Sequence, residues 1–240
     1  MAGETSYLDL LRFGDLGWGD ELAWGAWLTI QISVCSYLVG MVLGLLGAGA
    51  KLSHNKFLRW IADIYTTIVR AVPELLLIIL IFYTGTSALK KLLVSVGMSE
   101  GIDVSAFGAA VAALGFIAGA YMTEVFRGAI LAVPKGQMEA ARAYGMPATL
   151  RFRRILFPQL MRYALPGLNN LWLVIIKDSS LISVVGYYEL LFAGKQAAAS
   201  TRNYLFFYSV AALCFLALTV ISMIGSNYLE QRSKRGLRRA

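Results

Sequence analysis

The chain has 240 residues, of which 58% are hydrophobic and only 15% are charged, and its formal net charge at neutral pH is +8. A hydrophobic share this high excludes an ordinary soluble domain, and with it a soluble nucleic-acid-binding protein, and it indicates an integral membrane protein. Backbone polar groups must be paired inside a bilayer, where open sheet edges do not occur, so the fold is expected to be all-α.

The first 21 residues hold five acidic residues and one basic residue, the reverse of the basic start of a signal peptide. We therefore expect the first membrane span to remain uncleaved. The two cysteines, Cys35 and Cys214, each lie inside an apolar run and are interpreted as small buried apolar residues. The single histidine, His54, lies among basic residues in a predicted loop. We therefore expect no metal site and no cofactor bound by this chain.

Five apolar runs are long enough to cross a bilayer as helices, which takes about 20 residues. They are residues 23–50, 61–84, 107–126, 165–186 and 204–229. Together they predict a single membrane domain over 23–229, preceded by an N-terminal segment (1–22) and followed by a basic tail (230–240). The first and third runs contain Gly40-x-x-x-Gly44 and Gly115-x-x-x-Gly119, and small residues at this spacing predict closely packed helix faces.

The distribution of lysine and arginine predicts the orientation of the chain. Most of these residues follow the first, third and fifth spans, and few lie on the opposite side. Cytoplasmic loops carry the excess of Lys and Arg. The N-terminus is therefore predicted to be periplasmic and the C-terminus cytoplasmic, as an odd number of spans requires.

One polar stretch, Gly136–Pro158, separates the third and fourth apolar runs on the predicted cytoplasmic side. Its pattern predicts a short helix over 137–144, a stop at Gly145 with Pro147 just beyond it, and a second helix over 148–157 that ends at Pro158. A helix-turn-helix of this size would project from the membrane and could seat in a groove of a partner. The alternative is a solvated basic loop.

The same stretch has the order Glu-Ala-Ala, three residues, Gly, nine residues and Ile-x-x-Pro, which resembles the coupling loop of ABC importer permeases. The matching residues are Glu139, Ala140, Ala141, Gly145, Ile155 and Pro158. The likeness extends over most of the chain through Arg70-Ala71-Val72-Pro73, the segments 119–128 and 133–137, and Lys177-Asp178-Ser179-Ser180-Leu181. Together these segments resemble the polar amino acid uptake branch, and in particular the permeases for histidine, lysine, arginine and ornithine or for octopine and nopaline.

The resemblance implies a type I ABC importer permease in the bacterial inner membrane. It also implies four kinds of partner: membrane lipid, a second related permease subunit that would form a heterodimer, two ATPase subunits that bind ATP and Mg, and a periplasmic solute-binding protein. The coupling loop (134–160) would transmit ATPase closure to the spans. The chain itself is not expected to be an enzyme, because the segment 44–53 lacks the Gly-Lys-Ser/Thr of a phosphate loop. A scaffold that anchors an ATPase without passing solute is the alternative.

Charged side chains inside predicted spans are costly and suggest function. One hypothesis places them on a translocation path that contacts the cationic groups of an amino acid, with the candidates Glu74, Asp178, Ser179, Ser180 and Ser183. The other is structural pairing between spans or subunits, with the candidates Arg70, Glu124, Arg127 and Lys177. On a continuous second span Arg70 and Glu74 would lie one turn apart and could pair, and Glu124 could pair with Arg127. The acidity of Glu74 favours a cationic solute.

Overall fold

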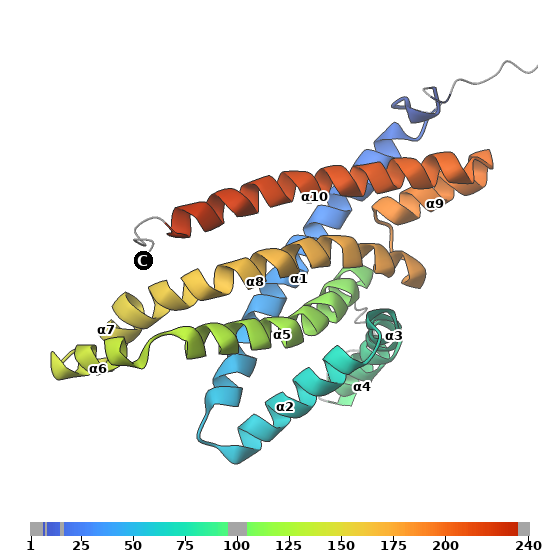
Figure 1. The fold of residues 1–240 in the computed structure, drawn as a ribbon. Coiled ribbons are helices and arrows are strands. Elements are labelled where there is room, and N and C mark those ends of the chain that lie inside the picture. Colours follow the sequence, from blue (N-terminus) through green and yellow to red (C-terminus); the bar gives the residue numbers. More distant parts are fainter. Residues whose placement is uncertain (1–6, 8, 15–16, 96–104, 235–240) are drawn as a thin grey trace, which may run out of the picture.

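We describe a computed structural model, in which the placed residues are 7, 9–14, 17–95 and 105–234. Every regular element within these ranges is helical, as expected (Figure 1). In chain order the elements are η1 (Asp9–Leu11), α1 (Gly19–Leu52), α2 (Lys56–Ala71), α3 (Glu74–Leu80), η2 (Ile81–Gly85), α4 (Thr86–Ser95), α5 (Ala106–Ala132), α6 (Lys135–Ala143), α7 (Ala148–Arg151), η3 (Phe152–Leu156), α8 (Phe157–Asp178), η4 (Ser179–Val185), α9 (Leu190–Thr201) and α10 (Tyr204–Lys234). Of these, η2 and η3 are π-helices, and η1 and η4 are 3₁₀-helices.

Four helical segments of the described chain are each long and apolar enough to cross a membrane: α1, α5, the continuous run Ala148–Val185, and Tyr204–Tyr228 within α10. Helix α2 and the segment Glu74–Ala88 pass the same test only together. The described chain therefore has four candidate spans, or five if the bent pair crosses as one.

The core of the molecule is the contact between α1 and α5, and the glycines of the two GxxxG motifs lie in it. A Cβ added at Gly44 would lie 2.6 Å from the Cβ of Met122, and one added at Gly119 would lie 2.7 Å from the Cβ of Leu43. The backbones approach so closely that only glycine fits without a shift at these positions. The packing faces predicted from the glycine spacing are confirmed.

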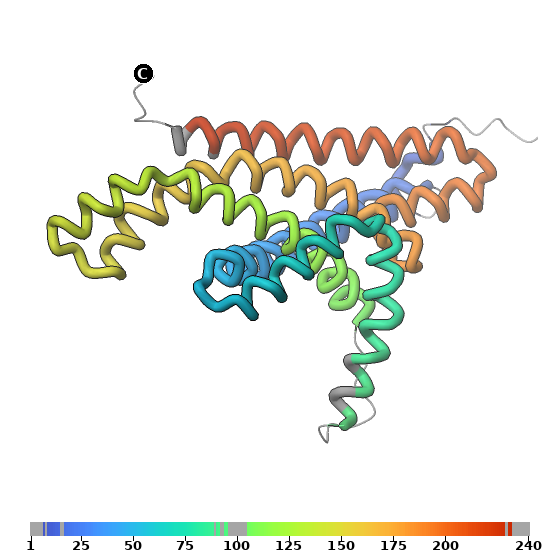
Figure 2. Tube along the Cα trace, turned by 60° about the horizontal axis from the view of Figure 1, so that its bottom comes forward, coloured from blue at the N-terminus to red at the C-terminus, as the bar shows by residue number. Residues whose placement is uncertain are grey.

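The second predicted span, 61–84, is not one straight helix. Helix α2 ends at Ala71 and α3 begins at Glu74, and the two directions differ by 112°. Pro73 is the physical reason, because a residue before proline is driven out of the α region, and Val72 is extended with φ −92° and ψ 140°. The segment from α3 to α4 consequently runs outward from the layer of long helices (Figure 2). The pairing expected between Arg70 and Glu74 is wrong, because the break lies between them and they form no ion pair.

The helical run that contains the fourth predicted span, 165–186, is longer than that span. Pro158 does not end the helix, which continues from α7 through η3 into α8. A proline within a helix removes one backbone donor. The wide π-turn over Phe152–Leu156 ends two residues before Pro158, so the hydrogen-bond register has already changed at that point. The helix tightens into the 3₁₀ turn η4 after Asp178 and ends at Gly186, whose φ is +85°.

Helix α9, which the apolar runs did not predict, is held against the N-terminal part of α1 by a buried carboxylate. Glu189 precedes α9 and accepts hydrogen bonds from the backbone N–H groups of Leu191 and Phe192 at 2.9 and 2.8 Å. The hydroxyl of Thr29 donates to the same carboxylate at 3.4 Å. Burial raises the pKa of Glu189 to about 7, although these donors act in the opposite direction.

Candidate functional site

A cavity of about 200 Å³ lies between α3, α5 and α8, at the bend of the second span. Its apolar wall comes from α5 and α8, through Leu114, Ile117, Ala118, Leu171, Val174 and Ile175. Its polar groups come from three different helices and are Glu74, Tyr121, Asn170 and Asp178. A mostly apolar cavity with a few convergent polar groups is the usual form of a small-molecule site.

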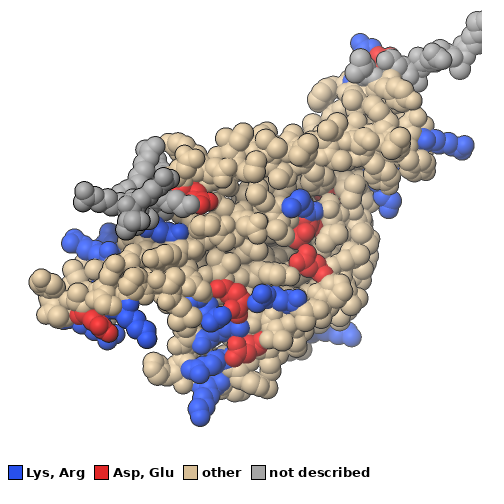
Figure 3. Space-filling view, in the orientation of Figure 1, with Lys and Arg blue, Asp and Glu red and all other residues tan. Residues whose placement is uncertain are grey.

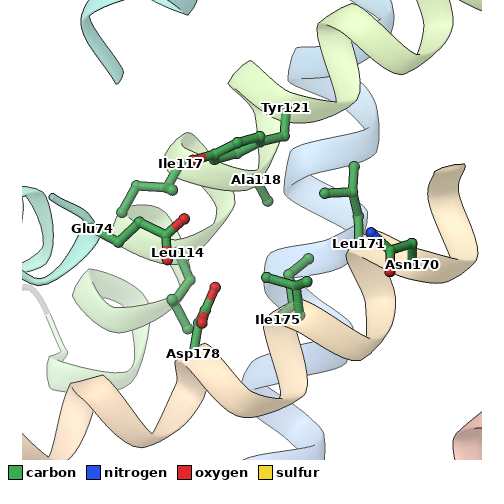
Figure 4. Close-up of a pocket in the computed structure, with 10 residues that line it drawn as sticks. Glu74, Leu114, Ile117, Ala118, Tyr121, Asn170, Leu171, Ile175 and Asp178 are labelled. Carbon is green, nitrogen blue, oxygen red and sulfur yellow. The ribbon is translucent and has the colours of Figure 1, made fainter. Parts of the chain in front are cut away.

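Two carboxyl groups face one another in this cavity. Glu74 is the first residue of α3 and Asp178 is the last residue of α8, and Figure 4 shows their carboxyl groups pointing toward each other. Neither forms an ion pair with a lysine or arginine of the described residues. Two carboxylates this close repel each other unless a proton or another cation lies between them. The acid pair therefore suits a cationic ligand.

The basic residues beside the acid pair point elsewhere. Arg70, in the last turn of α2, lies over the ring of Tyr121 with its guanidinium carbon 5.6 Å from the ring centroid. Lys177 is exposed, and it is rotated by about 100° around the helix axis from Asp178. Neither Arg70 nor Lys177 has an ion pair within the part of the chain that the structure describes. The structural pairing predicted for these two residues is therefore not formed among the described residues.

The serines predicted on the translocation path do not line the cavity. The hydroxyls of Ser179 and Ser180 donate to carbonyls of their own helix, those of Ile176 at 2.7 Å and Lys177 at 2.6 Å. Ser183 is buried in η4. Of the five residues predicted for the path, the structure brings together Glu74 and Asp178 only.

The structure adds Tyr121 and Asn170, which the sequence analysis did not single out as site residues. Tyr121 lies within the segment 119–128, which resembles the ABC importer permeases. Asn170 is the second residue of an Asn-Asn pair in an apolar run. A polar residue inside a predicted span was the available signal for both.

A separate charge network joins α1, α2 and α5. Arg127 donates to Glu124 at 2.9 Å, which confirms the predicted pair. Lys51 adds two ion pairs, to Glu124 at 2.5 Å and to Asp63 at 3.0 Å. The side chain of Lys51 is only 10% exposed, so this network fixes the end of α1 against the middle of α2 and the C-terminal half of α5.

The polar stretch forms the expected helix-turn-helix. Helix α6 is followed by Gly145, which has φ +69°, and its N–H donates to the carbonyl of Arg142 at 2.9 Å. The N–H of Met146 donates to the carbonyl of Ala141 at 3.1 Å, which completes a Schellman C-cap. The predicted stop at Gly145 is confirmed.

The coupling-loop residues divide into exposed and packed positions. Glu139 and Ala140 are exposed on α6, whereas Ala141 is buried. Ile155 is half-buried in η3 and Pro158 is exposed in α8. Helices α6 and α7 lie at one end of the molecule (Figure 1), so the exposed face of α6 is open to a partner.

Residues 40–235 match the family of binding-protein-dependent transport system inner membrane components. This chain belongs to that family. It is therefore a multi-pass inner membrane permease component, and the family favours transport over the scaffold alternative. The nopaline transport system permease protein of Agrobacterium fabrum is 47% identical over 96% of this chain and 98% of that protein. The histidine/lysine/arginine/ornithine transport system permease protein of Escherichia coli is 41% identical over 93% of this chain and 98% of that protein.

The fold of this family member also matches a solved structure. The chain aligns with a crystal structure of an amino acid ABC transporter with histidines at a TM-score of 0.76 and 28% identity. The alignment covers 90% of this chain and 95% of the other. The type I ABC permease fold predicted from the coupling-loop motif is thereby supported.

Proposed function

We propose that this permease imports basic amino acids or related opines, and that the solute passes the acid pair of Glu74 and Asp178. The facing carboxyl groups in the cavity between α3, α5 and α8 carry this proposal. The names of the relatives, which refer to nopaline and to histidine, lysine, arginine and ornithine, agree with a cationic solute.

The chemistry of the cavity suits each part of such a solute. A basic amino acid has two cationic groups, the α-ammonium and the side-chain cation, and the acid pair offers two carboxylates. Arg70 already lies over the ring of Tyr121, so the cationic groups of the solute would meet the two carboxylates. The apolar residues of α5 and α8 can contact the methylene groups.

The size of the cavity bears on the number of permease subunits. Its volume of about 200 Å³ is below the range of about 300 to 1,000 Å³ that is usual for ligand pockets. A second, related permease subunit would enlarge it by closing the open side. The likeness to permeases of basic amino acid systems favours two different subunits, so a heterodimer is part of the proposal.

The coupling to ATP is proposed to run through α6. Two ATPase subunits, which bind ATP and Mg, would receive the exposed face of α6 that carries Glu139 and Ala140.

The proposed domain division is a periplasmic segment 1–22, a membrane domain 23–229 that contains the coupling loop 134–160, and a basic cytoplasmic tail 230–240. In Figure 3, lysines and arginines gather toward the start of α2 and the end where α6 and α7 lie, which supports a cytoplasmic position for these parts. A periplasmic solute-binding protein would deliver the solute.

The experiment is ATP-dependent uptake by the reconstituted importer, with arginine and an uncharged amino acid as solutes. Replacing a charged partner of a cation costs about 1.5 to 3 kcal/mol, so arginine uptake at limiting concentration should fall by at least about tenfold in Glu74→Gln and in Asp178→Asn. Asp9→Asn, which changes an exposed carboxylate outside the cavity, is the matched control and should leave uptake unchanged.

Unchanged arginine uptake in both cavity variants would remove the acid pair from the path. The absence of ATP-dependent uptake of any tested solute by the wild-type complex would favour the scaffold alternative.

A further inference from the structure

A second cavity, of about 560 Å³, lies beside the coupling segment and is distinct from the acidic one. Its polar lining comes from α6, η3 and α8, and two prolines complete its wall. We call it the basic pocket and define it by Gln137, Arg154, Gln159, Arg162 and Tyr163.

The two arginines of the basic pocket have no anionic partner among the residues that the structure describes. Arg127 is satisfied by Glu124, and Arg151 donates to the carbonyl of Met146 at 2.7 Å. By contrast, Arg154 and Arg162 form no ion pair or hydrogen bond within the described ranges, and both are exposed. Two guanidinium groups that line one cavity repel each other, and an anion between them removes this repulsion. The pocket thus has the charge of an anion site.

The position of Arg154 depends on the π-helix η3. In a regular α-helix, residues eight apart point about 80° away from each other around the axis. Arg154 lies within η3 and Arg162 lies within α8, and the wider turn between them changes this offset so that both line the same cavity. Single π-turns within α-helices occur frequently at functional sites.

The surroundings of the pocket indicate where it lies relative to the membrane. Leu160 and Ala164, on either side of Arg162, belong to the same buried cluster as Phe126 and Ala129 near the C-terminal end of α5. Tyr163 is 48% exposed within the pocket wall. Tyrosine is enriched at membrane–water interfaces, and arginine beside it meets the phosphate layer of the lipid.

We propose that the basic pocket binds the phosphate of an anionic phospholipid. Arg154 and Arg162 would hold the phosphate oxygens through charge-assisted hydrogen bonds, and Tyr163 would lie against the glycerol region. The side-chain amide of Gln159 donates to that of Gln137, which ties the pocket wall to the first turn of α6. A bound lipid would therefore brace the coupling helix from the membrane side.

The test uses the purified importer complex in nanodiscs of two compositions, one of phosphatidylcholine alone and one that also contains phosphatidylglycerol. Native mass spectrometry counts the anionic lipids that stay bound, and ATPase activity is followed in parallel. Each arginine near the surface contributes about fivefold in affinity for an anionic lipid, so Arg154→Gln with Arg162→Gln should weaken lipid retention by about 25-fold. Arg153→Gln, an exposed neighbour that does not line the pocket, is the matched control and should retain the lipid.

Three outcomes would overturn the proposal. The first is that the double variant retains phosphatidylglycerol as the wild type does. The second is that inorganic phosphate at equal concentration displaces the lipid completely. The third is that the double variant loses the ATPase subunit while it keeps the lipid. The second outcome would indicate a site for free phosphate. The third would indicate that the arginines bind an acidic surface of the partner.

Discussion

The proposed coupling can be tested by adding one methyl group at Gly145, in the turn that follows α6. The residue has φ +69° and a Cβ added there would meet no atom within 4 Å, so the whole cost of Gly145→Ala lies in the backbone conformation. A left-handed conformation costs an L-residue about 1 to 2 kcal/mol. If the free variant relaxes out of this turn and α6 must return to the observed geometry to seat on the ATPase, the Kd for that subunit should rise by about 5 to 30-fold.

Two further variants separate backbone conformation from side-chain bulk. Gly145→Asn should cost less than the alanine variant, because asparagine visits the left-handed region more readily. Gly128→Ala places a methyl group on α5, outside the coupling loop, also with no atom within 4 Å, and should leave the Kd unchanged. The readouts are the Kd for the ATPase subunit and the ATP hydrolysed per solute imported.

Wild-type affinity and coupling in Gly145→Ala would refute the argument that this turn presents α6 to the ATPase. Equal losses in the alanine and asparagine variants would show that contact with added side-chain atoms, and not the positive φ, decides binding.

Three other predictions concern the packing and stability of the helices. Gly44→Ala should lower the free energy of unfolding by about 1 to 3 kcal/mol, because its Cβ would lie 2.6 Å from a methionine side chain of α5. Gly49→Ala, on the same helix, is the control and should be neutral, because its Cβ meets nothing within 4 Å. Thermal unfolding in detergent distinguishes the two variants. Lys51→Met leaves a partly buried carboxylate of α5 with a single basic partner and should cost about 1 to 3 kcal/mol, and an unchanged melting temperature would show that the network is dispensable. Burial raises the pKa of Glu189 from 4.5 to about 7, so its contribution to stability is present below about pH 4.5 and is lost as the pH rises through 7. The free energy of unfolding should fall by about 3 kcal/mol over this range, and Glu189→Gln should flatten the dependence; a wild-type curve without this slope would contradict it.

The sequence predicted best those features that depend on local chemistry. Hydropathy and length located α1, α5 and α10, and glycine spacing predicted a closely packed face on α1 and on α5. The stop at Gly145 followed from the need for a positive φ at a helix C-cap. In each case one segment, considered alone, contains the reason for its structure.

The features that were not predicted are of two kinds. In some, two sequence signals favour different structures, and in others the structure depends on contacts between distant segments. Pro73 was visible in the sequence, but the run 61–84 satisfied the length criterion for a span, and the backbone restriction before proline prevailed. At Pro158 the helix was predicted to end but continues, because the π-turn η3 before it accommodates the proline. Tyr121 and Asn170 reach the acidic cavity only because α5 and α8 are neighbours, which no local pattern shows.

The continuity of the helical run Ala148–Val185 has a mechanical consequence. The run begins beside the turn at Gly145 and carries Asp178 near its other end, 30 residues after its first residue, or about 45 Å at the helical rise of 1.5 Å per residue. If it tilts as a rigid lever about its first turn, a rotation of about 4° moves Asp178 sideways by about 3 Å, the length of one hydrogen bond. A small movement of α6 on its partner would then be enough to separate the two carboxyl groups from a bound cation.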